Sequence, residues 1–248
     1  MKTIIELFET SVAKFPNNTY LWEKQNGKYE ATTYNQTREQ VLKFGAGLVS
    51  LRLQKGDRVG LISEGRNAWI ISELGILYAG GINVPLSVKL ESGNDLKFRL
   101  AHSGSKMVIV SRGQASKIEE IADQLPELEK IIYLDGKENP GPKDISYEQV
   151  LALGTEYLKE KPDEFAALYN SVLPDDVANI SYTSGTTADP KGIMLTQLNY
   201  AANVVQSASL LHIGEDWKTL AFLPWDHSFA HTACLYCFMY YGASLASL

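Results

Sequence analysis

The sequence predicts an α/β fold with largely parallel β-sheets flanked by helices. From residue 58 onward, short apolar runs alternate with segments whose apolar residues recur at helical spacing. Strands that alternate with helices need crossover connections, which make the strands parallel and cover both faces of the sheet. A chain of 248 residues that is 45% hydrophobic and 21% charged can bury a core of the size that such a fold requires.

The elements of the N-terminal half follow from apolar spacing. The first helix occupies residues 4–15 and ends at Pro16, and a second runs over residues 35–51. Within the second, Gly45–Gly47 indicates close helix packing rather than a dinucleotide-binding turn, because it does not follow a strand. The other elements of this half are predicted strands at 58–63, 82–87, 107–110 and 131–134 and predicted helices at 68–78, 96–102 and 115–125.

The C-terminal half continues the alternation after a surface connection over residues 135–144, which contains two prolines and two glycines. We expect a polar helix near 156–169 and then a buried strand over 178–184. The other elements predicted are strands at 192–196, 219–224 and 243–248 and helices at 199–211 and 229–241. Because the last segment has the pattern of a buried strand with no helix after it, we expect the chain to be the N-terminal part of a longer protein.

Composition and charge narrow the class of protein. The net charge of -6 and the lack of a basic patch argue against a nucleic-acid partner, although a small anionic ligand remains compatible with them. Two cysteines, Cys234 and Cys237, are too few for a disulfide framework and indicate a reducing, cytoplasmic location. Charged residues interrupt the N-terminal segment, and no apolar stretch reaches 18 residues, so we expect neither a secretory signal nor a transmembrane span.

One segment combines backbone freedom with many hydrogen-bond donors. "YTSGTTADPKG", Tyr182 to Gly192, follows a predicted strand and holds Thr183, Ser184, Thr186 and Thr187 beside Gly185 and Lys191. Glycine lets consecutive amides converge on an anion, hydroxyl groups add donors, and lysine adds a mobile positive charge. Since ligands usually bind at the carboxyl ends of strands in α/β folds, the segment predicts a polyphosphate site.

Two other interpretations of this segment are less specific. It is not a Walker A loop, because Pro190 precedes Lys191 and Gly192 follows it. A surface turn rich in small polar residues is the structural alternative, but it does not account for the spacing of the proline and the lysine.

Three segments together resemble the adenylate-forming superfamily. "YTSGTTADPKGIMLT" is similar to its phosphate-binding signature, residues 32–63 resemble the N-terminal signature of acyl-CoA synthetases, and "FLPWDHSFAHT" is similar to their acyl-pocket segment. The last segment looks most like that of long-chain fatty acid ligases. The resemblance implies that residues 1–248 are a partial N-terminal adenylation domain, without the remainder of that domain and the C-terminal lid, and that this part alone is inactive.

The resemblance also implies a reaction and assigns residues to it. A carboxylate attacks the α-phosphorus of ATP, pyrophosphate leaves, and coenzyme A intercepts the acyl-adenylate. Lys191 would compensate phosphate charge, and the Thr186 hydroxyl would bind Mg²⁺. The phosphates of ATP would contact Thr183, Ser184, Gly185, Thr186, Thr187, Lys191 and Gly192. Two departures from the family pattern are Ala188, where a glycine is usual, and Gln197, where a histidine is frequent.

The acyl-pocket segment supplies His227, which the resemblance places beside the acyl carboxylate as a catalytic group, and Trp225, which it places near the mouth of the pocket. A helix-capping role is the structural alternative for His227. The spacing of His227, His231, Cys234 and Cys237 would also suit a metal ion, but the surrounding apolar residues indicate a core helix instead.

Three functions therefore stay open. The leading one is the ATP- and acyl-binding part of a ligase that joins a fatty acid to coenzyme A. The second is another adenylating enzyme, acting on an aryl or amino acid carboxylate. The third, from a different class, is a truncated nucleotide-binding module without activity. A fatty substrate is compatible with peripheral membrane contact, although no basic amphipathic helix indicates it.

Overall fold

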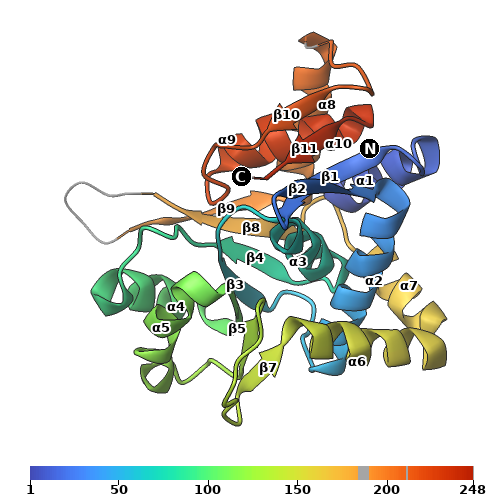
Figure 1. Ribbon diagram of the computed structural model, residues 1–248. Helices are drawn as coiled ribbons and strands as arrows, with labels where there is room; N and C mark the ends of the chain where they lie inside the picture. Colours follow the sequence, from blue (N-terminus) through green and yellow to red (C-terminus); the bar gives the residue numbers. More distant parts are fainter. Residues whose placement is uncertain (184–189, 211, 248) are drawn as a thin grey trace.

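A computed structural model of the protein describes residues 1–183, 190–210 and 212–247 (Figure 1). In these residues, the larger sheet has seven strands in the order β7-β6-β5-β3-β4-β8-β9, and neighbouring strands are parallel except for β8 and β9. The mixed α/β architecture with mostly parallel sheets is thus confirmed. The strands are β3 (Arg58–Ile62), β4 (Ile82–Pro85), β5 (Ser105–Val110), β6 (Lys130–Tyr133), β7 (Asp144–Ser146), β8 (Val177–Tyr182) and β9 (Gly192–Thr196).

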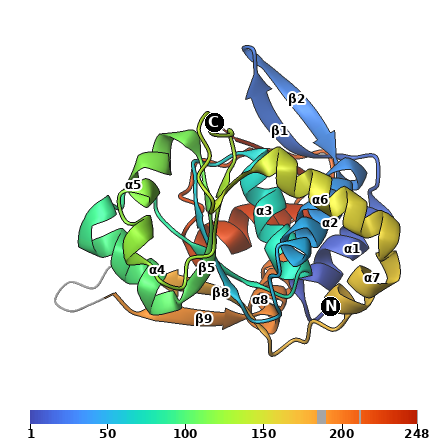
Figure 2. The same cartoon turned by 90° about the horizontal axis from the view of Figure 1, so that it is seen from below.

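Helices cover both faces of this sheet (Figure 2). One face carries α2 (Tyr34–Ser50), α3 (Asn67–Tyr78) and α6 (Tyr147–Glu160), and the other carries α4 (Lys97–Ser103) and α5 (Ala115–Glu119). Alternating strand residues separate two cores, because Leu61 and Ile109 join the first cluster while Ile62 and Val108 join the second. Burial on both faces makes these strands continuous apolar runs, which is why sequence periodicity located them.

A smaller sheet brings the two ends of the chain together. In the described residues it has the order β10-β11-β1-β2, with β1 (Thr19–Gln25), β2 (Lys28–Thr33), β10 (Lys218–Leu220) and β11 (Ser244–Ala246). The hydroxyl of Tyr34 donates to the carbonyl oxygen of Ala243 over 2.7 Å, which ties the start of α2 to the segment before β11. Helices α1 (Ile4–Lys14), α8 (Gln197–Leu210) and α10 (Cys237–Tyr241) pack beside this sheet.

The β1–β2 hairpin is an element that the apolar pattern did not predict. Its turn residues, Asn26 and Gly27, have φ of 50° and 82°, as a two-residue type I′ turn requires. The strands hold several charged residues, and β2 is mostly exposed, so they lack the apolar run that marked the others. The Asn26-Gly27 pair is the feature of the sequence that indicates this hairpin turn.

Two predicted helices are each divided into shorter pieces. The polar helix expected near 156–169 is two helices, because α6 begins at Tyr147 and α7 (Pro162–Asn170) begins at a proline, which cannot continue a helix but suits a first turn. The helix expected over 229–241 consists of α9 (Ser228–Ala230), a π-helical turn η4 (His231–Tyr236) and α10. Its core assignment holds for Leu235 and Met239, which are fully buried, but is wrong for Phe229, which is exposed.

Other differences concern boundaries. Helix α5 is flanked by short 3₁₀ turns, η2 (Arg112–Gln114) and η3 (Ala122–Gln124), and a π-helical turn, η1 (Ser92–Leu96), precedes α4. Strand β10 ends at Leu220 rather than 224, and β7 forms at the end of the connection expected over 135–144. In β8, Ala178 and Asn179 are buried, whereas the last residues are half-buried because β9, its neighbour, is an edge strand.

Close packing of the second helix is confirmed. A Cβ atom on Gly45 would lie 2.8 Å from the carbonyl oxygen of Gly75, so only a glycine lets α2 approach α3 this closely.

No helix in the described part of the chain is long and apolar enough to cross a membrane.

Candidate functional site

The phosphate-binding segment predicted from the sequence connects β8 to β9. These strands are antiparallel, with Tyr182 paired to Gly192, and the amide of Thr183 donates to the carbonyl oxygen of Lys191 over 3.1 Å. Thr183 and Lys191 therefore stand opposite each other at the base of the hairpin, and both are exposed. The expected phosphate ligands Ser184, Gly185, Thr186 and Thr187, the expected Mg²⁺ ligand Thr186 among them, lie outside the described residues.

Gly192 has a packing role at this position. A Cβ atom there would lie 2.9 Å from Cγ2 of Ile180, closer than real Cβ atoms pack, and 3.4 Å from the ring of Tyr182, an ordinary contact. A glycine thus lets the first residue of β9 pair with the end of β8. The assignment of Gly192 to phosphate binding stays a prediction. Strand pairing is a separate, structural reason for a glycine at this position.

Tyr182 anchors the base of the hairpin to α4. Its hydroxyl donates to the carbonyl oxygen of Arg99 over 3.2 Å and lies 2.9 Å from Nδ1 of His102. The guanidinium carbon of Arg99 lies 5.7 Å from the centre of the Tyr182 ring, within the range of a cation–π contact. Burial raises the pKa of Tyr182 above its ordinary value, so the hydroxyl keeps the proton that it donates at neutral pH.

The acyl-pocket segment lies close to this hairpin. His227 and Asp226 follow β10 and line a cavity of about 240 Å³ together with Tyr182, Arg99 and Ser87. The side chain of His227 is 66% exposed, and its Nε2 lies 3.8 Å from Oδ2 of Asp226. Two segments that are separate in the sequence therefore meet at one cavity, next to the first residue of the predicted phosphate site.

A second cavity, of about 430 Å³, adjoins the first and shares Leu86, Ser87, Asp226 and His227 with it. Trp225, expected near a pocket mouth, is 5% exposed and forms a buried wall of this cavity. Its indole Nε1 donates to the carbonyl oxygen of Ala221 over 3.3 Å, and its ring meets that of Trp69 edge-to-face at 5.4 Å.

The rim of the second cavity carries charge of both signs. Lys89 and Glu64 line it together with Asp226. Burial alone would raise the pKa of Glu64, but hydrogen bonds from Ser111 and Gln114, at 2.6 and 2.7 Å, lower it below its ordinary value. Glu64 is thus an ionised carboxylate that already accepts hydrogen bonds from Ser111 and Gln114.

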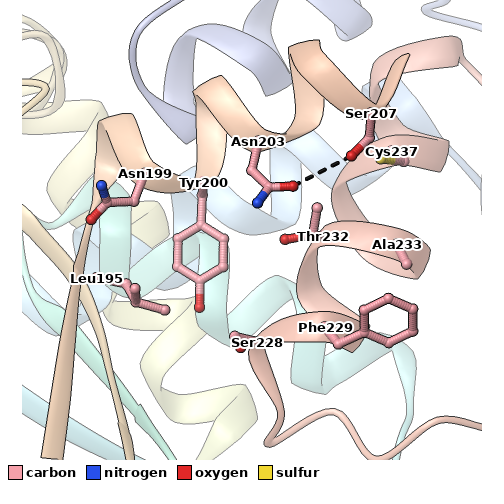
Figure 3. Close-up of a pocket in the computed structure, with 10 residues that line it drawn as sticks. All are labelled: Leu195, Asn199, Tyr200, Asn203, Ser207, Ser228, Phe229, Thr232, Ala233 and Cys237. Atoms are coloured by element: carbon pink, nitrogen blue, oxygen red, sulfur yellow. Dashed lines mark hydrogen bonds between the residues drawn. The ribbon is translucent and has the colours of Figure 1, made fainter. Parts of the chain in front are cut away.

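A third cavity, of about 460 Å³, lies between α8 and the α9–η4 segment (Figure 3). Tyr200 points from α8 toward Ser228, and Phe229 closes the opposite end, beside Thr232 and Ala233. Cys237 also lines this cavity, and burial raises the pKa of its thiol to about 11, so the sulfur stays protonated and behaves as a small apolar group. Apolar and aromatic side chains make up half of its lining, and asparagine, serine and threonine side chains make up the rest. Such a mixture suits a mostly apolar ligand with a few polar contacts.

Two other roles were considered for His227, as a helix cap and as a metal ligand. His227 occupies the N-cap position of α9, but its side chain makes no capping hydrogen bond, so a capping role does not account for it. Among the described residues, no three His, Cys, Asp or Glu side chains lie where they could hold a metal ion together. His231 is fully buried, whereas His227 is exposed, which separates two of the residues whose spacing had suggested a metal site.

Gln197, the residue where the family often carries a histidine, has a structural partner. Its side chain is 1% exposed, and its Oε1 accepts a hydrogen bond of 3.0 Å from the amide of Ile4. The amide side chain therefore joins the start of α8 to the start of α1. Ala188, the other departure, lies outside the described residues.

The sequence pattern of the AMP-binding enzyme family matches residues 8–247. The chain belongs to the AMP-binding enzyme family. A similar curated protein is a long-chain-fatty-acid–CoA ligase of Xenopus laevis, 27% identical over 249 residues, in an alignment that covers 98% of this chain and 33% of the relative. The chain thus spans about a third of the length of that relative.

Solved structures resemble this chain in fold. A long-chain-fatty-acid–CoA ligase from Archaeoglobus fulgidus has a TM-score of 0.83 at 20% identity, covering 98% of this chain and 46% of that protein. The anthranilate–CoA ligase AuaEII, solved in complex with anthranoyl-AMP, has a TM-score of 0.81 at 22% identity, covering 98% and 44%. At these identities the likeness establishes the fold, and the substrate needs a separate argument.

Proposed function

We propose that the full-length gene product is an AMP-forming ligase that activates a fatty acid and transfers it to coenzyme A, and that residues 1–248 supply its ATP- and acyl-binding part. The observation that carries the proposal is the cavity shared by Tyr182, at the base of the phosphate hairpin, and His227, from the acyl-pocket segment. A reaction between the α-phosphorus of ATP and a carboxylate requires these two ligands to meet.

In the first step, a carboxylate oxygen attacks the α-phosphorus of ATP, and the bond from that phosphorus to the bridging oxygen breaks. Pyrophosphate leaves with the bonding electrons, and the acyl-adenylate remains. Charge gathers on phosphate oxygens during this step, so positioning and electrostatic stabilisation supply most of the rate enhancement. Thr183 and Lys191 stand at the two ends of the hairpin connection, where their side chains would contact the β- and γ-phosphates.

In the second step, the sulfur of coenzyme A attacks the acyl carbonyl carbon, the bond to the AMP oxygen breaks, and AMP leaves. The thiol proton passes to solvent or to a base. We assign His227 to the reacting carboxylate and its adenylate, because it lines both cavities beside the hairpin. Mg²⁺, with Thr186 as its proposed ligand, would neutralise phosphate charge when bound.

The acyl chain is proposed to occupy the cavity between α8 and the α9–η4 segment. Leu195, Phe229 and Ala233 give this cavity apolar walls, and Ser228, the neighbour of His227, lies at one end of it (Figure 3). The described residues that line this cavity of about 460 Å³ include no acidic side chain. A hydrocarbon chain is therefore favoured over an amino acid, whose ammonium group would need a buried acidic partner.

The proposal includes a cytoplasmic location with peripheral membrane contact, from which a fatty substrate would be taken. Residues 1–248 on their own are proposed to be inactive, since they span only about a third of the related ligase. Co-sedimentation of the gene product with lipid vesicles tests the membrane contact.

Fatty-acid-dependent exchange of radiolabelled pyrophosphate into ATP tests the adenylation step in the full-length gene product. A panel of fatty, aryl and amino acids separates the proposed substrate class from other carboxylates, and detection of acyl-CoA tests the second step. Binding of ATP without exchange for any carboxylate would favour the nucleotide-binding module instead.

A further inference from the structure

A buried ion pair lies directly behind the segment that carries His227. Nε2 of His231, on η4, lies 2.8 Å from Oε1 of Glu73, on α3, and the two side chains are 0% and 2% exposed. Isolated charges are rarely retained at such depth, because the loss of hydration costs several kcal/mol for each ion. The pair therefore indicates a role for Glu73 and His231 that apolar side chains of the same volume could not fill.

One side of the pair leads to the strand that ends at the phosphate hairpin. Oε1 of Glu73 accepts a hydrogen bond of 3.0 Å from Nδ2 of Asn83, on β4. Asn83 is in register with Asn179 of β8, and Oδ1 of Asn179 accepts a hydrogen bond of 2.8 Å from the hydroxyl of Ser181. Glu73 is thus hydrogen-bonded to β4, and the partner residue on β8 is hydrogen-bonded to Ser181, the residue before Tyr182, although no hydrogen bond joins the side chains of Asn83 and Asn179.

The other side of the pair holds the backbone of His227. The carbonyl oxygen of His227 accepts from the amides of Ala230 and His231, at 2.9 and 3.3 Å, and lies 3.1 Å from Nδ1 of His231. Nδ1 of His231 faces this carbonyl, while Nε2 lies 2.8 Å from the carboxylate without the geometry of a hydrogen bond. The contact with Glu73 is therefore an electrostatic one, which protonation of the imidazole strengthens. The side chain of His231 thereby fixes the peptide from which the imidazole of His227 enters the cavities.

The pair also stands between the walls of two cavities. The ring of His231 lies 5.5 Å from that of Trp69, which lines the cavity of about 430 Å³, and 5.7 Å from that of Tyr200, which lines the cavity of about 460 Å³. A shift of His231 would therefore move both walls together with the His227 peptide.

We propose that Glu73 and His231 are positioning residues that hold His227 in its place for adenylate formation. The proposal rests on the function proposed above for the His227 cavity. Neither residue lines any of the three cavities beside the hairpin, so each acts through the His227 backbone and does not touch the substrate.

The test compares Glu73→Gln with the matched control Glu9→Gln in the full-length gene product. Glu9 also pairs with α3, through the Tyr78 hydroxyl at 2.7 Å, and with Arg38, but contacts no element of the site. Misplacement of a reacting group by about 1 Å costs about 100-fold in rate, so we expect Glu73→Gln to lower kcat for adenylate formation by about 10- to 100-fold. The KM for ATP should change less than about 2-fold, and Glu9→Gln should leave kcat within about 2-fold.

A double-mutant cycle with His227→Ala distinguishes positioning from general stability. If Glu73 acts through His227, Glu73→Gln has little further effect once His227 is alanine. If the fold-changes in kcat of the two single variants multiply in the double variant, the proposal is wrong. It is also wrong if active-site titration shows that the lower kcat of Glu73→Gln comes only from a smaller fraction of active enzyme.

A second measurement does not depend on activity. The ring resonances of His227 in ¹³C-histidine-labelled protein, assigned with His227→Ala, should shift in Glu73→Gln, whereas those of His212 should not. If Glu73→Gln does not fold, the variant Glu73→Gln/His231→Gln, which leaves no lone buried charge, takes its place. An unchanged His227 resonance would contradict positioning, and a shifted resonance in a protein without exchange activity would show that the proposed function alone had failed.

Discussion

The amide of Thr183 donates to the carbonyl oxygen of Lys191 over 3.1 Å, so one hydrogen bond closes the hairpin and sets a hydroxyl side chain opposite an exposed lysine. Both residues therefore present their side chains from a fixed backbone position beside the cavity that Tyr182 and His227 line. This arrangement would let the hairpin and His227 act on the same substrate.

Replacement of Lys191 by alanine should slow adenylate formation in the full-length gene product by about 100- to 1,000-fold, the range measured when one charge-stabilising donor is removed from an active site. Pyrophosphate exchange measures the effect. Lys159→Ala, at an exposed lysine of α6 whose partner is Glu156, is the control and should have no effect. Unchanged exchange by Lys191→Ala would remove the residue from the mechanism.

Replacement of His227 by alanine should lower kcat/KM for the carboxylate substrate by about 100-fold, because the group beside the reacting carboxylate is lost. The Kd for ATP, measured by calorimetry, should stay within about 2-fold. The side chain of His227 makes no capping hydrogen bond, so the stability of α9 should not change. A loss of ATP affinity as large as the loss of kcat/KM would argue against a role at the acyl group.

Replacement of Ala233 by phenylalanine should fill part of the cavity between α8 and the α9–η4 segment. Rates with long-chain fatty acids should fall by at least about 10-fold relative to short-chain acids, because a buried methylene contributes about 0.8 kcal/mol. Exchange assays across chain lengths measure this. If all chain lengths lose rate equally, the acyl chain lies elsewhere.

Replacement of Gly192 by alanine should destabilise the hairpin, because the new Cβ atom would lie 2.9 Å from Cγ2 of Ile180. Overpacking of this kind costs about 1–3 kcal/mol, which lowers the apparent Tm by about 2–10 °C. Ile180→Ala removes the clashing atom, so the effect of Gly192→Ala should be smaller in that background. Equal effects in both backgrounds would show that packing against Ile180 is not the reason for a glycine here.

The Glu73–His231 pair should make stability depend on pH. Burial alone would lower the pKa of His231, but Glu73 and the carbonyl of His227 raise it above the ordinary value of 6.5. The native state thus binds this proton more tightly than the unfolded state, and the stabilisation is complete below about pH 6.5 and decreases as pH rises through the raised pKa.

The measurement is the difference in apparent Tm between the natural chain and Glu73→Gln, taken from pH 6 upward, which we expect to shrink as pH increases. The groups that face His231 are Glu73, Tyr200, Tyr236 and Asp226 together with the His227 carbonyl. Burial raises the pKa of Tyr200 and of Tyr236 far above this range, so neither phenol titrates there. A difference that grows with pH would contradict a charged His231.

Sequence periodicity predicted the inner strands β3, β4, β5 and β6 of the larger sheet well, because they are mostly buried and each is an apolar run between helical segments. It did not predict β7, whose three residues are only half-buried. It did not predict the β1–β2 hairpin, whose β2 strand is mostly exposed, although Asn26 and Gly27 marked the turn. Pro162, a helix-breaking residue visible in the sequence, divides α6 from α7, and a π-helical turn that starts at His231 interrupts the last predicted helix.

The candidate site was predictable in its parts but not in its assembly. Motif spacing predicted a role for the hairpin residues Thr183 and Lys191, and the acyl-pocket segment predicted one for His227. Only the fold shows that His227 shares a cavity with Tyr182, the residue before Thr183. The partnership of Glu73 with His231 had no signal in the sequence, since the two residues lie on separate elements and no local spacing relates them. Long-range pairs of this kind become visible only once the topology is known.

The hairpin and the His227 segment are proposed to form one adenylation site, and fatty-acid-dependent exchange of labelled pyrophosphate into ATP by the full-length gene product is the decisive measurement. We expect exchange with fatty acids, formation of an acyl-adenylate, and loss of both in Lys191→Ala. ATP binding without exchange for any fatty, aryl or amino acid would contradict it.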